Sequence, residues 1–547
     1  MKLRFQTLAV LASLTLLILG VITADAVVGA RPADEPTGFR ATTLTQRPNI
    51  VLVLTDDLDL QLDTLNYTPA IRSLMTDQGL TFSQFFANVS LCCPSRSSLL
   101  RGQYVHNHQV YTNGPPTGGF QKAYASGIES ATIATALQSA GYRTALMGKY
   151  LNGYPDTAAA NYIPPGWSEW YSPISGNAYS EFNYTLNENG TSVAYGTTPQ
   201  DYLVDVLSRK ATNFITRTAA LDTTPFFLYI APYVPHQPAT PAPRYSALFP
   251  NVQAPRLPSW NEADISDKPS NIRKLPALSP TSIQQIDTLY RRRLQSMQAV
   301  DDMLTGVVQA LQATGQLENT YIILTSDNGY HMGEHRLMPG KYLPYEEDIH
   351  IPLIIRGPGI PAGQTNAALT SMVDLAPTFA ELAGVTLPVA ADGRSLVRLF
   401  EQQPSTVPWR QAVLVEQYPI ATQEPASTAA APKRLNGYEP YDTFDAQIDP
   451  TAFYFGLRTG SYKYVEYSND PSTGERELYD LQNDPYELQN LVSRANPVFL
   501  SQLSAWLAAL RTCSGASCRT ADAMTPPQFA LTDANANYMP FISKSSE

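Results

Sequence analysis

Short apolar runs recur along this chain, each beside a stretch with helical periodicity, and they restrict the fold more than any other feature. The first run is Asn49–Leu54, and later runs occupy 144–147, 226–230 and 321–324. A run without polar alternation is typical of a strand that is buried on both faces of a parallel sheet. Strands of this kind alternating with helices predict an α/β fold, in which helices flank a mostly parallel sheet.

The stretches between these runs have the apolar spacing of amphipathic helices. One follows Pro69, with Ile71, Leu74 and Met75 on one face and Gly79 at its end. The other predicted helices occupy 132–140, 203–215 and 282–313. Each of these three leads into the next apolar run, so we expect helices on both sides of the sheet.

The last part of the chain has a different pattern. Residues 453–458 and 462–467 alternate like strands of a small antiparallel sheet, and a helix is predicted near 498–510. Residues 419–450 are rich in Ala, Pro, Thr and Tyr without a period, which indicates a long surface loop. We therefore expect a smaller C-terminal subdomain over 406–547, made of an antiparallel sheet plus a helix.

The N-terminus has the pattern of a secretory signal. A short basic region precedes an apolar run over 8–22, and Ala24–Ala26 offers a small-residue cleavage site. We expect a signal peptide over 1–26, a polar linker over 27–46, and a secreted or periplasmic protein. The alternative is an uncleaved N-terminal anchor, although the apolar run is short for a membrane span. No later segment is apolar enough to cross a membrane after signal cleavage.

The charge balance excludes one class of partner. Lysine and arginine total 37 against 48 aspartates and glutamates, which gives a formal net charge of −11. This acidity argues against a general nucleic-acid binder. An anionic substrate would need a local group of cations within an acidic protein.

Oxygen-bearing side chains follow two of the predicted strands. Asp56 and Asp57 come after the first apolar run, and Asp327 and Asn328 come after the run at 321–324. Sites in open α/β sheets form beyond the carboxyl ends of the strands. An oxygen-only group suits one hard cation such as Ca²⁺ or Mg²⁺ better than a two-zinc site, which would need more histidines. The alternative is that the Asp56-Asp57 pair only caps a turn.

The four cysteines form two pairs along the sequence. Cys513 and Cys518 close a small loop, which suits a disulfide in an exported protein. Cys92 and Cys93 are adjacent, and adjacent cysteines rarely bridge each other. A short helix is predicted from Cys92 to Gly102, so Cys92 would lie at a helix N-terminus that favours anions. The alternative is a buried structural pair.

The segment Cys92-Cys-Pro94-Ser-Arg96 resembles the signature of the type I sulfatase family. Cys92 has proline at +2 and arginine at +4, whereas Cys93 does not fit the pattern. Further segments that resemble this family are Arg47–Asp57, Gly148–Tyr150, Pro235–Pro238, Ser326–Gly329 with Lys341, and Glu477–Leu491. The resemblance is greatest to the branch of N-acetylglucosamine-6-sulfatases and heparan endosulfatases.

The resemblance implies an alkaline-phosphatase-like fold with a sulfatase catalytic domain over 47–405. It implies that a formylglycine-generating enzyme oxidises Cys92 to formylglycine during export. It implies one Ca²⁺ ion, for which the ligands are Asp56, Asp57, Asp327, Asn328 and residue 92. The implied catalytic residues are residue 92, Arg96, Lys149, His236, His331 and Lys341. His236 would protonate the leaving oxygen or hold the sulfate, while the hydrated aldehyde attacks sulfur and later releases sulfate.

The substrate is the least constrained part of this interpretation. The expected substrate is a sulfated sugar or another sulfate ester, with the 6-O-sulfate of N-acetylglucosamine preferred. Leu151 stands where many arylsulfatases have a histidine, and His331 is expected to take part of that role. His106 and His108 are weaker candidates for the site. The rival functions are an arylsulfatase, a phosphonate monoester or phosphodiester hydrolase, and an inactive binder of sulfated glycans.

Sugar selectivity is expected to depend on loops within 155–200 and 419–450. An aromatic group near the first of these could stack on sugar faces if it were exposed. Its members are Trp167, Trp170, Tyr171, Tyr179 and Tyr184. The alternative is that these rings belong to the core.

Overall fold

The computed structural model describes residues 47–221, 224–400, 409–419, 453–467 and 474–532. The expected signal peptide and linker, and nearly all of the loop expected over 419–450, lie outside these residues. In the described ranges, no helix has the length and apolar character needed to cross a bilayer.

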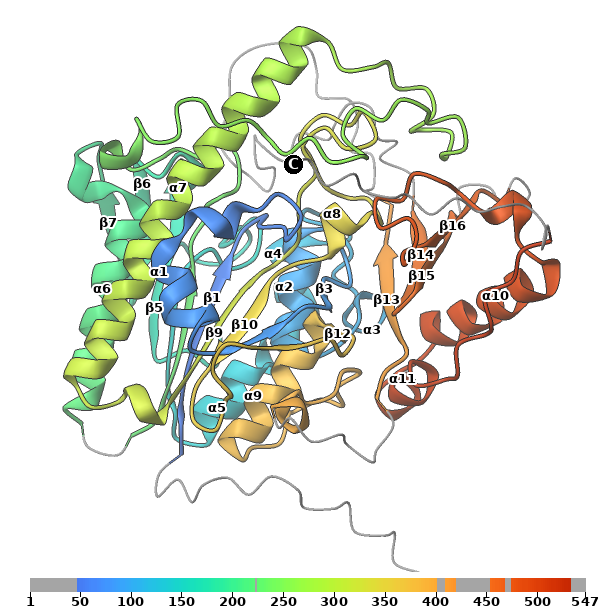
Figure 1. Ribbon diagram of the computed structural model, residues 1–547. Helices are drawn as coiled ribbons and strands as arrows, with labels where there is room; N and C mark the ends of the chain where they lie inside the picture. The colour runs from blue at the N-terminus through green and yellow to red at the C-terminus, as the bar shows by residue number, and fades with distance from the viewer. Residues whose placement is uncertain (1–46, 222–223, 401–408, 420–452, 468–473, 533–547) are drawn as a thin grey trace, which may run out of the picture. The chain divides into compact units, whose positions relative to one another are not determined.

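A ten-stranded sheet forms the centre of the structure (Figure 1). In spatial order its strands are β11 (Gln364–Asn366), β2 (Leu80–Phe82), β10 (Leu353–Arg356), β9 (Thr320–Ser326), β1 (Asn49–Thr55), β8 (Phe226–Ala231), β4 (Arg143–Gly148), β5 (Glu169–Gly176), β6 (Tyr184–Glu188) and β7 (Thr191–Tyr195). The five central strands, β9 to β5 in this order, are parallel to one another, and β10, β6 and β7 pair antiparallel. The predicted mostly parallel sheet is confirmed.

The helices of this part of the chain include the ones that the sequence predicts. They are α1 (Pro69–Ile71), α2 (Cys92–Arg101), α3 (Val105–His108), α4 (Gly119–Ser126), α5 (Ile133–Ser139), α6 (Leu203–Ala219), α7 (Pro280–Ala313), α8 (Glu346–Ile349) and α9 (Leu375–Ala383). The helix predicted after Pro69 consists of α1 and a π-helical turn over Arg72–Thr76. Two short strands, β3 (Phe85–Phe86) and β12 (Thr370–Ser371), pair outside the large sheet.

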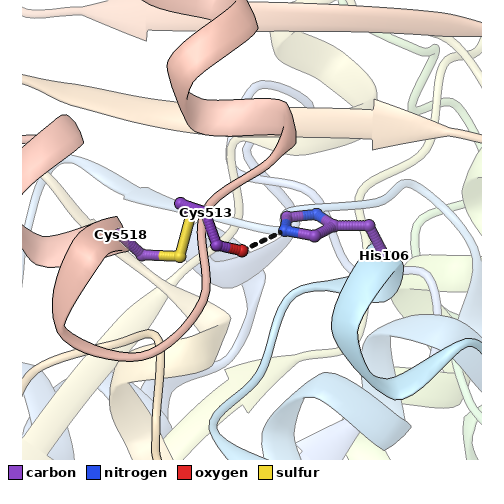
Figure 2. Close-up of side chains that lie close together, drawn as sticks. All are labelled: His106, Cys513 and Cys518. Atoms are coloured by element: carbon purple, nitrogen blue, oxygen red, sulfur yellow. Dashed lines mark hydrogen bonds between the residues drawn. A yellow bond between two sulfur atoms is a disulfide. The ribbon is translucent and has the colours of Figure 1, made fainter.

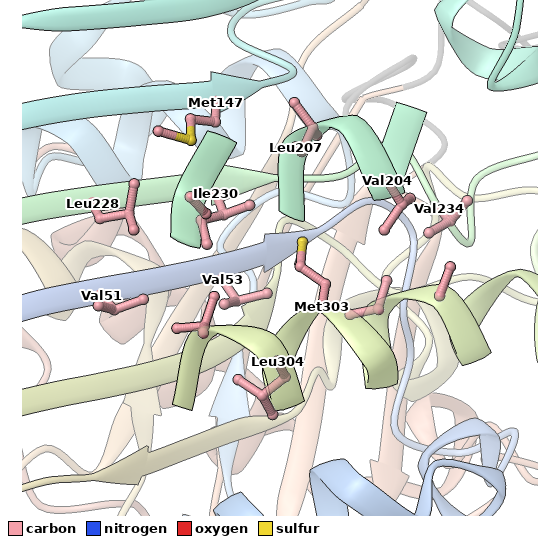
Figure 3. Close-up of a cluster of buried hydrophobic side chains, with 14 of the residues drawn as sticks. Val51, Val53, Met147, Val204, Leu207, Leu228, Ile230, Val234, Met303 and Leu304 are labelled. Carbon is pink, nitrogen blue, oxygen red and sulfur yellow. The ribbon is translucent and has the colours of Figure 1, made fainter. Parts of the chain in front are cut away.

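The core explains why the strand sequences are continuously apolar. Every residue of β1 is buried, because both faces of this central strand are covered. Val51 and Val53 lie in one apolar cluster with Met303 and Leu304 of α7 (Figure 3). Burying one such side chain contributes about 1.5–3 kcal/mol. These contacts fix β1, and they fix the start of the loop that follows it.

The region 155–200 is more regular than the expected loops. It contributes β5, β6 and β7, and a hairpin joins the last two through Asn189 and Gly190. Both turn residues have positive φ, 52° and 92°. Asn-Gly is the strongest short sequence signal for such a turn. Much of the stretch expected to form loops therefore consists of strands, and this dipeptide is the sequence signal for the turn between two of them.

A smaller antiparallel sheet follows the large one along the chain. Its strands are β13 (Ala412–Gln417), β14 (Tyr454–Thr459), β15 (Tyr462–Tyr467) and β16 (Arg476–Asp480), and its helices are α10 (Pro497–Arg511) and α11 (Ala516–Ala521). Cys513, just after α10, forms a disulfide with Cys518 of α11. The predicted antiparallel sheet, helix and disulfide are confirmed.

A buried arginine joins distant parts of the chain. Arg410 precedes β13, and its guanidinium donates to Asp522 Oδ2 (2.8 Å) after α11 and to Asp374 Oδ1 (2.7 Å) before α9. All three side chains are buried. The arginine therefore compensates two carboxylates that would otherwise be isolated from water.

We predict that Arg410→Met strongly destabilises the protein, because it leaves Asp374 buried without its paired cation and leaves Asp522 paired with Arg394 alone. Removing one partner of a buried ion pair typically costs about 3–5 kcal/mol. The measurement is denaturant unfolding of the full chain, with Arg72→Met as a control at an exposed position. Equal stability of the two variants would show that the pairing contributes nothing.

Candidate active site

Two neighbouring strands end at the same edge of the large sheet. The strands β1 and β9 are parallel, with Thr55 beside Ser326. The residues that follow them are Asp56, Asp57, Asp327 and Asn328, all fully buried. The backbone N–H of Asp57 donates to Asp327 Oδ1 (3.2 Å), and the Asn328 amide donates to Asp57 Oδ1 (2.7 Å). The structure brings these four side chains into one group.

Helix α2 begins at this group. Cys92 is its first residue, and the Cys92 Sγ atom lies 2.8 Å from Lys341 Nζ and 3.4 Å from Asp56 Oδ1. One turn further along, Arg96 Nε donates to Asp327 Oδ2 (2.8 Å). Cys92 and Arg96 therefore face the carboxylates of both strand ends.

Lys149 reaches the same group from the end of β4. Its Nζ atom donates to Asp56 Oδ2 (2.7 Å), and its backbone N–H donates to Ala231 O (2.8 Å) at the end of β8. Gly148, just before it, has φ 109°, and a Cβ there would lie 2.0 Å from Ala231 O. Only glycine permits this close approach, which sets the direction of Lys149.

The result is a balanced group of buried charges, which we call the charge cluster. Its members are Asp56, Asp57, Asp327, Arg96, Lys149 and Lys341. Lys341 Nζ completes it with a bond to Asp57 Oδ1 (2.8 Å). Burial alone would raise the pKa of Asp56, but Lys149, His236 and Arg96 hold that pKa below its ordinary value. Asp56 is therefore ionised at neutral pH.

The same environment disfavours ionisation of the Cys92 thiol. Burial raises the pKa of Cys92 well above its ordinary value, and Asp56 raises it further, while Lys149 and Lys341 act in the opposite direction. The thiolate is the nucleophilic form of cysteine. Burial therefore disfavours the nucleophilic form of this sulfur.

His236 lies on the loop after β8 and faces the charge cluster. Its Nδ1 atom is 2.7 Å from the carbonyl oxygen of Gln237, which can only accept, so Nδ1 carries a proton. Its Nε2 atom is 3.6 Å from Asp57 Oδ2. His236 can therefore hold or move a proton at Nε2 beside the cluster.

His331 is tied to the segment that carries Lys341. Its backbone exchanges two hydrogen bonds with Gly340, at 2.9 and 3.1 Å. Its Nδ1 atom lies 2.8 Å from Asp348 Oδ1, and the second oxygen of Asp348 accepts from the backbone of Leu343. Asp348, which no pattern in the sequence singles out, fixes both the imidazole and the loop beside it.

His106 and His108 have structural partners instead. The ring nitrogens of His106 lie 2.9 Å from Glu416 Oε2 and 2.9 Å from Cys513 O, so this side chain joins α3 to β13 and to the disulfide loop (Figure 2). His108 bonds Ser98 Oγ (3.0 Å), and burial lowers its pKa to about 3. Each histidine is thus occupied by contacts outside the charge cluster.

Most of the aromatic group beginning at Trp167 belongs to the core. Trp167, Trp170 and Tyr184 are 8%, 0% and 1% exposed, so the idea of an exposed sugar platform is wrong for them. Tyr179 is also buried, but its ring lies 4.9 Å from Lys149 Nζ. It therefore forms part of the wall beside the charge cluster.

Arg293 of α7 is a residue of the site that the sequence analysis missed. It is fully buried and donates to the carbonyl oxygens of Asp57 (2.5 Å) and Pro235 (3.2 Å). It thereby holds the loop after β1 against the loop that carries His236. An arginine within the apolar stripe of a predicted helix was the signal that could have found it.

The cluster contains oxygens that a metal ion would satisfy. Asp57 Oδ2 and Asn328 Oδ1 are buried and accept no hydrogen bond from any described residue. Donor atoms of Asp56, Asp57, Cys92 and His236 lie within 4.8 Å of one another. Buried oxygens without partners are costly unless a cation or a donor meets them. These residues fit one divalent cation held mainly by oxygen.

A cavity of about 90 Å³ opens beside Lys149. Its lining includes Leu151, Tyr154, Ile174, Tyr179 and Tyr233. Among the described residues, Lys149 is the one charged group that lines it. A small, neutral part of a ligand could therefore lie in this partly aromatic cavity, next to the cationic site.

Comparison with known proteins gives consistent matches. The sulfatase family model matches residues 48–385. N-acetylglucosamine-6-sulfatase of Homo sapiens is 36% identical over 494 residues, which are 88% of this chain and 88% of that protein. An extracellular sulfatase Sulf-1 homologue of Caenorhabditis elegans is 38% identical over 377 residues, or 67% of this chain. The match spans about half, 52%, of that second relative.

A solved structure confirms the fold class. It is described as a complex with its substrate D-glucosamine-2-N,6-O-disulfate, and it matches with a TM-score of 0.65 at 23% identity. The match covers 87% of this chain and 99% of that chain.

Proposed function

This chain belongs to the sulfatase family, which hydrolyses sulfate esters, and we propose that its substrate is the 6-O-sulfate of N-acetylglucosamine in glycosaminoglycan-type sugars. The observation that carries the proposal is the charge cluster, with Lys341 Nζ 2.8 Å from Cys92 Sγ. Three cations meet at the one position where the signature places the reacting residue. A sulfate there would be stabilised in a protein whose net charge is −11.

The position of each residue in the site determines its role in hydrolysis. A formylglycine hydrate made from Cys92 by a formylglycine-generating enzyme would supply the attacking oxygen. Lys341 lies beside that position, and Arg96 and Lys149 bind the neighbouring carboxylates of Asp327 and Asp56. These cations neutralise charge on the sulfate oxygens as the bond to the sugar oxygen breaks.

The leaving oxygen needs a proton from a nearby acid. The Nδ1–H group of His236 donates to the carbonyl oxygen of Gln237, which holds the ring in place. The Nε2 atom is therefore the one that would give a proton to the leaving oxygen. His331, oriented by Asp348, supports the segment that carries Lys341. A well-placed general acid typically contributes about 10²–10⁴-fold to the rate.

The substrate assignment rests on a relative and on the cavity beside Lys149. The relative that matches 88% of this chain is named for N-acetylglucosamine 6-sulfate. A primary 6-sulfate projects from its ring and can enter a buried cationic site while the ring stays outside. Leu151 and the tyrosines of the cavity would contact the neutral sugar and its acetamido group.

We also propose that the protein is secreted after removal of the signal at 1–26. Two matched relatives are named extracellular sulfatases. The disulfide between Cys513 and Cys518 suits an oxidising compartment. Oxidation of Cys92 to formylglycine belongs to the same export route.

We propose one Ca²⁺ ion per chain, bound by Asp56, Asp57, Asp327 and Asn328 together with residue 92. The prediction is that Ca²⁺ at about 100 times its Kd raises the free energy of unfolding by about 2.7 kcal/mol. Asn328→Leu should abolish this gain, because it removes a ligand oxygen without changing charge. The difference in the free energy of unfolding between Ca²⁺ and a chelator measures this gain.

The control for this experiment is Asn213→Leu, at an exposed position on α6. It should keep the full Ca²⁺ effect. Two zinc ions per chain in a metal analysis, or an unchanged Ca²⁺ effect in Asn328→Leu, would refute the assignment.

The substrate prediction concerns Leu151. We expect the wild-type protein to have a higher kcat/KM for N-acetylglucosamine 6-sulfate than for an aryl sulfate or a phosphonate monoester. Leu151→His should lower the ratio of kcat/KM for the sugar sulfate to kcat/KM for the other two esters by about 10-fold or more, because it puts a polar ring into the neutral cavity. Leu221→His, at an exposed leucine, is the matched control. A wild-type preference for the aryl ester or the phosphonate would overturn the substrate assignment.

A further inference from the structure

A second, larger cavity lies between α6 and the β5–β7 edge of the large sheet. Its volume is about 570 Å³. Arg209, Lys210, Asn213 and Arg217 line it from α6, and their spacing places them on one face of the helix. We call this cavity the edge groove. Nothing in the charge cluster contributes to it.

The edge groove is locally cationic in an acidic protein. It contains four cations, Arg143, Arg209, Lys210 and Arg217, and two carboxylates, Glu169 and Glu188. The net charge of this lining is therefore +2, whereas the whole chain carries −11. An anion would find there a local attraction that the net charge of the whole chain does not supply.

The guanidinium groups of the edge groove are held in fixed positions. Glu169, only 4% exposed, accepts from Arg143 Nη2 (2.6 Å) and from Arg217 Nη2 (2.8 Å). Arg143 Nη1 makes no hydrogen bond within the described ranges, so it remains available to a ligand. A fixed guanidinium binds sulfate or carboxylate oxygens at a low entropic cost.

Two tyrosine rings and a carboxylate beside Lys210 complete the edge groove. Lys210 Nζ lies 4.8 Å from the ring of Tyr171 and 5.9 Å from the ring of Tyr195, and it pairs with Glu188 at 2.7 Å. Both tyrosines are half-buried. Rings of this kind can pack on sugar faces, and carboxylates accept from sugar hydroxyls. A lining of cations, carboxylates and tyrosines suits an anionic sugar better than a uniformly charged phosphate chain.

The edge groove and the charge cluster lie at opposite ends of β4. Arg143 begins this strand, and Lys149 follows its end. Six residues at about 3.3 Å each separate the two side chains by about 20 Å. The neighbouring strand β5 connects the two regions, since Glu169 and Tyr171 line the groove while Ser172–Gly176 line the cavity beside Lys149.

We propose that the edge groove is a second binding site for a sulfated saccharide chain, separate from the site of hydrolysis. It would hold a distant part of a chain whose end enters the cavity beside Lys149. This second statement rests on the proposed function, whereas binding in the groove does not.

The test uses the full chain with Cys92→Ala, so that bound saccharide is not hydrolysed. The probe is a heparan-type sulfated octasaccharide, titrated by calorimetry in the presence of saturating N-acetylglucosamine 6-sulfate. Arg209→Glu reverses an exposed charge of the groove, and Arg72→Glu makes the same change elsewhere on the surface. We expect Arg209→Glu to weaken binding by at least about 10-fold and Arg72→Glu to have little effect. Equal affinities in the two variants would overturn the proposal.

A second variant separates a sugar site from a general anion patch. Tyr195→Ala should weaken binding of the octasaccharide but should not weaken binding of single-stranded DNA of equal charge. Loss of both ligands to the same extent, or DNA binding as tight as that of the octasaccharide, would refute a saccharide site.

The kinetic readout distinguishes this proposal from the proposed function. In the active protein, Arg209→Glu should raise KM for a sulfated oligosaccharide several-fold and leave kcat/KM for the monosaccharide ester unchanged. An unchanged KM for the oligosaccharide would contradict the role of the groove during hydrolysis. Absence of wild-type activity on the monosaccharide ester would refute the proposed function and leave the binding result standing.

Discussion

The balance of buried charges at the carboxyl edge of the large sheet is the constraint on which the site depends. Asp56, Asp57 and Asp327 are fully buried and are compensated by Arg96, Lys149 and Lys341. Losing one partner of such a group leaves a buried charge uncompensated. Each cation comes from a different segment, so the fold must bring α2, the end of β4 and the loop after His331 to the same place. The parallel pairing of β1 with β9 supplies the frame.

The same balance explains how an acidic protein can act on an anion. The net charge of −11 is spread over the whole chain, whereas the cations of the site are concentrated around residue 92. A divalent ion would add positive charge at the same point, at the oxygens of Asp57 and Asn328 that accept no hydrogen bond from the described residues. The high pKa of the Cys92 thiol fits a residue that acts after conversion to another group. The attraction of an anion is therefore local. It arises in the site and, in our proposal, at the edge groove.

The sequence allowed prediction of those features that depend on short segments. Continuous apolar runs identified β1 and β9, and strand-end topology then placed Asp56 and Asp57 near Asp327. Features that depend on distant partners could not be predicted. Arg293 contacts Asp57, which lies 236 positions away in the sequence, and Asp348 contacts His331, which lies 17 positions away. Burial of Trp170 depends on neighbours such as Tyr150, which no local pattern reveals.

The central claim is that residue 92 works as an aldehyde within the charge cluster. The most direct test is the mass of the peptide that contains residue 92, taken from the exported, active protein. We predict the mass of formylglycine at position 92 and of an unmodified cysteine at position 93, with activity rising in proportion to the converted fraction. A fully active preparation in which residue 92 has the mass of cysteine would contradict it.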